Sequence, residues 1–196
     1  MPEAAEIDWA AFKEFVDEFK GESDRAAVIL GAAKLDALLA QMLDRYLLPS
    51  LGSSDELLEG DSPLSTFSSR INVSYRLGLI TPDFAKSLHL VRRIRNSFAH
   101  EISGVSLSSG SHSDRLKSLL LPFLPLPFFK EFRAHFFGEE TSKSNFRACL
   151  SLMAARLETR LNATTQTSNV EAYNVILKAW ENEEITMEDE GKGSAT

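Results

Sequence analysis

The segment RNSFAH, residues 95–100, contains three side chains that could do chemistry together: Arg95, Asn96 and His100. An imidazole at position 100 could act as general base or acid on a ribose 2′-hydroxyl. A guanidinium at position 95 could neutralise the charge that develops on the phosphate in the transition state. Such a cleavage of RNA needs no metal ion. The structural alternative is that Arg95 pairs with a helix acid and that His100 bonds to a backbone carbonyl.

A helix from Thr81 to Glu101 is predicted to position these groups. Thr81 can cap its N-terminus, Pro82 suits the first helical position, and Asp83 lies where the helix dipole favours an acid. At about 100° per residue, one side of this helix is apolar. The residues on that side are Phe84, Leu88, Val91, Ile94 and Phe98.

Arg95 falls on this apolar side, although it carries a charge. A guanidinium is costly in a dry interface when it is unpaired, so Arg95 needs a carboxylate, a phosphate or water. The long helix predicted upstream, from Ser23 to Leu48, contains Asp36 among small apolar residues. Gly31 and its neighbouring alanines would permit a close approach of another helix. We therefore predict that Asp36 faces Arg95 across packed helices.

Apolar periodicity predicts further helices, and no segment alternates as a strand would. The clearest of these helices are predicted from Asp8 to Lys20, from Ser65 to Leu77 and from Ser142 to Asn162. A short helix around 116–121 could be capped by Ser113. Another could follow Ser168, which forms a capping-box pattern with Glu171. The fold class predicted is all-α: one domain, 1–180, built as a bundle of about six or seven helices and followed by an acidic, disordered tail, 181–196.

Two segments are predicted to lack helical structure. Residues 102–114 are rich in Ser and Gly and are expected to form a loop. The stretch from Leu119 to Phe129 is apolar but contains three prolines, and we expect its proline-rich part, after Leu121, to cover the core without forming a helix. It is also too short to cross a bilayer.

The charge of the chain is uneven. The 196 residues carry a net charge of −7, and segment 181–196 contributes −5 of it, which leaves about −2 for residues 1–180. Arginines gather between Phe67 and His100, in a helix pair that could be mistaken for a helix-turn-helix. Because the body of the chain has no overall basic field, we do not expect direct DNA binding.

Neither a cofactor nor a metal is expected. Cys149 is a single cysteine among apolar neighbours, which favours a packed thiol over a zinc ligand or a reactive group. A phosphate-binding loop, a dinucleotide glycine pattern, a nucleophile elbow and a metalloprotease motif are all missing from the sequence. The N-terminus shows no signal-peptide pattern and the most apolar run is too short to span a membrane, so a cytoplasmic protein is expected.

Two related families share motifs with this sequence. RNSFAH resembles the R-x4-H motif of the HEPN superfamily (higher eukaryotes and prokaryotes nucleotide-binding), all-α bundles that often act as metal-independent ribonucleases. A wider segment, about 23–105, resembles the mannitol-operon repressor (MltR-like) family. That resemblance depends on GDSPL at 60–64, SRI at 69–71, YRLGLI at 75–80 and the motif from Arg95 to His100.

The MltR-like resemblance implies a dimeric, cytoplasmic regulator of transcription that acts through a protein partner rather than by reading DNA. Nothing in the chain ties it to a mannitol operon. The HEPN resemblance implies the alternative, an endoribonuclease of a toxin or defence system, with two motif copies facing each other in a homodimer. Arg95, Asn96 and His100 would then be the catalytic residues, Asp36 would support them, and RNA would be the partner.

Overall fold

The structure, a computed structural model, describes residues 9–101 and 106–168. Every regular element in those ranges is an α-helix, which confirms the predicted fold class. These helices belong to one compact unit that ends at Gln166. The helix predicted after Ser168 and the acidic segment 181–196 lie outside the described residues. The seven helices are α1 (Trp9–Gly21), α2 (Asp24–Tyr46), α3 (Phe67–Arg76), α4 (Pro82–His100), α5 (Gly110–Leu120), α6 (Pro127–Phe137) and α7 (Ser142–Asn162).

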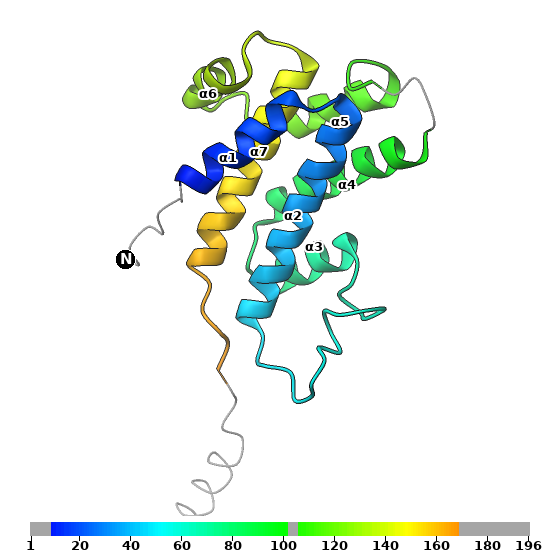
Figure 1. Cartoon of the computed structure of the whole chain (residues 1–196), viewed down its shortest axis with the longest axis vertical. Helices are drawn as coiled ribbons and strands as arrows, with labels where there is room; N and C mark the ends of the chain where they lie inside the picture. The colour runs from blue at the N-terminus through cyan, green and yellow to red at the C-terminus, as the bar shows by residue number, and fades with distance from the viewer. Residues whose placement is uncertain (1–8, 102–105, 169–196) are drawn as a thin grey trace, which may run out of the picture. The chain divides into compact units, whose positions relative to one another are not determined.

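Helices α2 and α7 form the centre of the fold and lie side by side (Figure 1). α2 also contacts α1, α3 and α4, whereas α7 also contacts α1, α5 and α6. Nine residues of α2 are buried, which explains why its sequence is apolar on most sides. α2 is long and apolar enough to pass for a membrane span by length and composition, but 50% of that stretch is buried inside the fold.

Gly31 lets α2 approach α7 closely. A Cβ atom at this position would lie 2.3 Å from Leu150 Cδ1 and 3.1 Å from Phe19 Cζ, so any other residue would displace its neighbours. Leu150 and Phe19 are both buried in the core, where they have little room to move. The small residue therefore sets how close the two central helices come, as the sequence predicted.

We predict that Gly31→Ala lowers the free energy of unfolding by about 1 kcal/mol or more in urea denaturation. Overpacking a core costs roughly 1–3 kcal/mol, which exceeds the ~1 kcal/mol that alanine gains in helix propensity. Gly21→Ala is the matched control, because no atom lies within 4 Å of a Cβ atom there. A Gly31→Ala protein as stable as the wild type would contradict the close packing.

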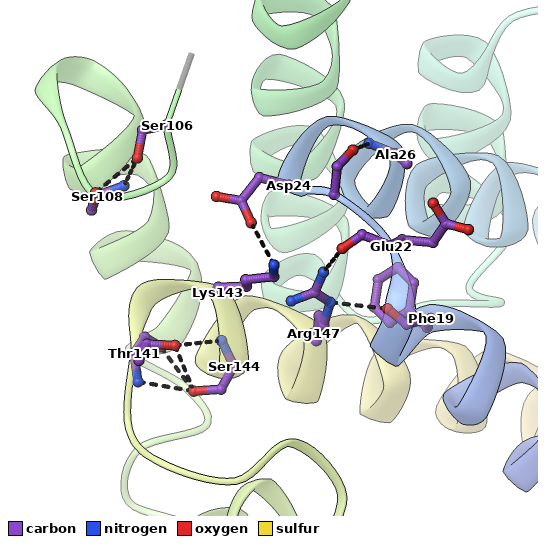
Figure 2. Close-up of polar contacts among 11 residues, drawn as sticks. Phe19, Glu22, Asp24, Ala26, Ser106, Ser108, Thr141, Lys143, Ser144 and Arg147 are labelled. Carbon is purple, nitrogen blue, oxygen red and sulfur yellow. Dashed lines mark hydrogen bonds and ion pairs between the residues drawn. The ribbon is translucent and has the colours of Figure 1, made fainter. Parts of the chain in front are cut away.

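Arg147 ties α7 to the turn between α1 and α2. Its side chain is buried, and Figure 2 shows it reaching two backbone carbonyls. Nε donates to the carbonyl oxygen of Phe19 at 3.0 Å, and Nη2 donates to that of Glu22. The Phe19 carbonyl belongs to the last turn of α1, where no N–H of the same helix is available to donate to it. One turn earlier, Lys143 forms a 3.6 Å ion pair with Asp24 at the start of α2.

The structure corrects the prediction at two helices. α5 begins at Gly110, so part of the predicted loop 102–114 is helical, and Ser113 lies inside the helix instead of capping it. α6 was missed: it begins at Pro127, inside the stretch expected to be irregular. Proline lacks an N–H that the first helical turn does not use, so it can begin a helix as well as break one.

The prediction for Cys149 is confirmed. The residue is fully buried on α7, and burial raises the pKa of its thiol well above the ordinary value. A thiol in this state is a packing group rather than a nucleophile.

Candidate functional site

Helix α4 forms as the sequence predicted. The Thr81 hydroxyl oxygen accepts a hydrogen bond from the backbone N–H of Phe84, Pro82 occupies the first turn, and Asp83 faces the positive end of the helix dipole. The five residues of the apolar side are all buried: Phe84, Leu88, Val91, Ile94 and Phe98. The helix is therefore fixed in rotation, and its remaining side chains have defined directions.

Arg95 lies at the edge of the core rather than inside it. Its side chain is exposed and Nη1 donates to Asn96 Oδ1 at 3.1 Å. It lines a hollow of about 220 Å³ between α2, α3 and α4. The other lining residues are Ala32, Ala33, Asp36, Ala37, Phe67 and Arg70. Arg95 thus lies where helices meet, as predicted, but this junction of α2, α3 and α4 is open to solvent.

The predicted pairing of Asp36 with Arg95 is wrong in its partner. Asp36 Oδ1 forms an ion pair with Arg70 Nη1 at 2.8 Å, and the Arg70 side chain is only 15% exposed. Arg95 forms no ion pair with any residue in the described ranges. α3 lies against α2 as well as α4, so an arginine of α3 reaches the acid first. In the sequence, Arg70 is one of the arginines between Phe67 and His100 and part of SRI at 69–71, and neither pattern indicates its partner.

His100 is the last residue of α4 and is exposed. Among the described residues, no hydrogen bond or ion pair joins it to Arg95 or Asn96. Within the described residues, one chain therefore joins Arg95 to Asn96 but does not bond the His100 imidazole to that pair. His, Cys, Asp and Glu side chains in the described parts of the chain form no group of three that could hold a metal ion.

Three residues that the sequence analysis missed hold the C-terminal end of α4. His112 of α5 is buried, with Nε2 3.3 Å from Glu101 Oε1 and its ring edge-on to Phe98. Arg115 Nη1 donates to Ser97 Oγ at 2.8 Å, and Arg25 donates to the Glu101 carbonyl. These contacts come from elements distant in sequence, so no local pattern could have indicated them. Together these contacts hold the last turn of α4, which carries the end of the RNSFAH motif, against α2 and α5.

The side of α4 that faces away from the core is basic, in a chain that is acidic overall. We call it the α4 polar face, and its residues are exposed or half-buried. Segment 67–100 holds six Arg or Lys and one Asp, a formal charge of +5, in a chain whose total is −7. The remaining residues therefore carry −12. The face consists of Lys86, His89, Arg92, Arg93, Asn96 and His100.

His89 links this face to α3. Its Nε2 lies 3.0 Å from Asn72 Oδ1, which requires the imidazole to donate from that nitrogen. Burial lowers the pKa of His89 from its ordinary 6.5, and the charges of Arg92 and Arg93 lower it further. The imidazole is therefore neutral at neutral pH and serves as a hydrogen-bonding group between two helices.

We predict that the stability of the protein depends less on pH when His89 is replaced by Gln, which keeps a donor for Asn72. Below about pH 6.5 the unfolded chain binds this proton more readily than the folded chain. The stability that His89 contributes is thus present above that pH and is lost as pH falls towards the folded pKa. Urea unfolding at pH 7.5 and 5.5 should show a smaller decrease for His89→Gln than for the wild type; equal decreases would contradict this account.

Comparison with known proteins bears on the fold. No protein-family model matches the chain, and no curated protein matches it. Among solved structures, it resembles a chain in the X-ray structure of the MtlR–HPr complex from Escherichia coli. The TM-score is 0.56, the sequences are 19% identical, and the match covers 75% of this chain and 98% of that one. The protein therefore has an MtlR-type fold, as the family resemblance implied; the HEPN relationship stays a prediction.

Proposed function

We propose that this protein is an MtlR-like regulator of transcription that acts in the cytoplasm by binding a protein partner. The observation that carries the proposal is the fold, which matches 98% of the chain in the MtlR–HPr structure. MtlR stands in a complex with the protein HPr there. We extend this mode of action to the present chain, as a homodimer with an HPr-type protein as the candidate partner.

The α4 polar face is the surface that we assign to the contact. Of its charged members, only Lys86 forms an ion pair within the described residues, with Asp83 at 2.9 Å. Arg92 and Arg93 are therefore available to a partner. Because the rest of the chain is acidic, an acidic protein surface would be attracted to this face and oriented by it. Direct reading of DNA is not part of the proposal, since the formal charge of −12 on the residues outside segment 67–100 would repel the phosphate backbone.

We predict that Lys86→Glu with Arg93→Glu weakens binding of HPr, purified from the organism that encodes this chain, by at least about tenfold in calorimetry. Both side chains are exposed, so their reversal should leave the fold intact. The loss should grow smaller as salt is added, because exposed charges are screened.

The matched control is Lys13→Glu with Lys130→Glu. Both lysines are exposed on α1 and α6, and the double variant changes the net charge by the same amount. It should bind HPr like the wild type. Equal weakening by both double variants would argue against the α4 polar face, and no binding of HPr to the wild type would argue against this partner.

The second candidate function is a HEPN-type, metal-independent endoribonuclease. The observation that favours it is the hydrogen bond between Arg95 and Asn96 at the edge of an open hollow, with His100 exposed nearby on the same helix. A second copy of the chain would have to supply the facing motif. RNA would then be the partner in place of a protein.

An RNA-cleavage assay in EDTA separates the two functions. The regulator proposal predicts that neither the wild type nor His100→Ala cleaves RNA. Cleavage that survives EDTA, disappears in His100→Ala and persists in His135→Ala would establish the ribonuclease instead. His135 is a suitable control because it is exposed on α6, outside the motif.

A further inference from the structure

A second concave surface lies between α1, α6 and α7. It is a groove of about 420 Å³, a size typical of small-molecule sites. Five of the ten described residues that line it are aromatic. Phe12 contacts Phe132 with ring centroids 6.0 Å apart, and Trp9 contacts Phe12 edge-on at 5.8 Å. Phe123, from the segment that leads into α6, and Phe128, in the first turn of α6, also line it.

The apolar side chains around this groove are poorly covered. Trp9 is 67% exposed and Phe128 is 50% exposed, and both line it. Exposing large apolar side chains to water is unfavourable, and a bound apolar molecule would lower the free energy by covering them. The groove is therefore a surface that gains from being occupied.

Arg156 of α7 is the one charged side chain among the described residues that line the groove. Its guanidinium carbon lies 4.8 Å from the centre of the Phe84 ring, and it forms no ion pair with a described residue. Thr159, one turn later, uses its hydroxyl to donate to the Ala155 carbonyl at 2.9 Å. A guanidinium is thus the one group at the groove that can still bind a ligand through charge.

We propose that this groove binds an apolar carboxylate, an aliphatic or aromatic acid of moderate size. The aromatic walls would take the hydrocarbon body, and Arg156 would bind the carboxylate in the paired geometry that guanidinium groups favour. Charge selects the class of ligand, because none of the described residues that line the groove is acidic and a cationic ligand would meet Arg156. This inference does not depend on the proposed function, since it concerns different residues.

Trp9 provides a direct test. The chain has two tryptophans, Trp9 and Trp180, so the full-length Trp180→Phe protein has Trp9 as its single reporter. Decanoate is the probe, kept below its critical micelle concentration, and decan-1-ol is the uncharged comparison of equal chain length. We expect a saturable change in Trp9 emission with decanoate, and at least about tenfold weaker binding of the alcohol.

Arg156→Gln should weaken decanoate binding about tenfold and leave decan-1-ol binding unchanged, because only the acid uses the guanidinium. Arg156 is exposed, so the variant should fold normally. Arg76→Gln, an exposed arginine of α3, is the matched control and should bind both probes like the parent. Phe128→Ala should weaken both probes.

Three results would overturn the proposal. The first is the lack of a saturable response to decanoate. The second is equal affinity for acid and alcohol, or an Arg156→Gln protein that binds decanoate like the parent. The third is a Trp9 emission that changes with protein concentration in the absence of any probe, together with a dimer in analytical ultracentrifugation that Phe128→Ala dissociates. The groove would then be covered by a second copy of the chain.

Discussion

The close contact between α2 and α7 is the constraint on which the rest of the structure depends. At Gly31 the two longest described helices approach until a single methyl group would collide with Leu150 and Phe19. Arg147 adds two hydrogen bonds to the backbone around the α1–α2 turn. With α2 fixed from this side, its other side receives α3 and α4, and the Arg70–Asp36 ion pair joins α3 to it. The direction of the α4 polar face therefore depends on packing far from that face.

The separation of charge gives this scaffold a physical role. A formal charge of +5 on segment 67–100 and −12 on all other residues means that the molecule attracts acidic surfaces in one place and repels them elsewhere. Such an arrangement orients a protein partner during encounter. It also explains why net charge alone was a poor guide, because an acidic total conceals a basic surface. The groove beside Arg156 lies on other elements and would serve a different kind of ligand.

Local patterns predicted the helices that carry the site, whereas partners between helices could not be predicted. The caps of α4 and its five buried residues follow from spacing, because each depends on neighbours within one or two turns. The helical wheel placed Arg95 on the apolar side, but its side chain is exposed beside a hollow, and the residue that pairs with Asp36 is Arg70 of α3. α6 was missed because Pro127 was interpreted as a break when it is a start. His112 and Arg115 were missed because they come from another helix.

The most direct measurement of the central claim is hydrogen–deuterium exchange of the full chain with and without HPr from the same organism. This reports which backbone amides are covered without altering any residue. The account predicts slower exchange along α4 and in the adjoining part of α3 when HPr is present, with α1 and α6 unchanged. Protection on α1 and α6 alone, or no change anywhere at saturating HPr, would contradict the assignment of the basic surface as the docking site.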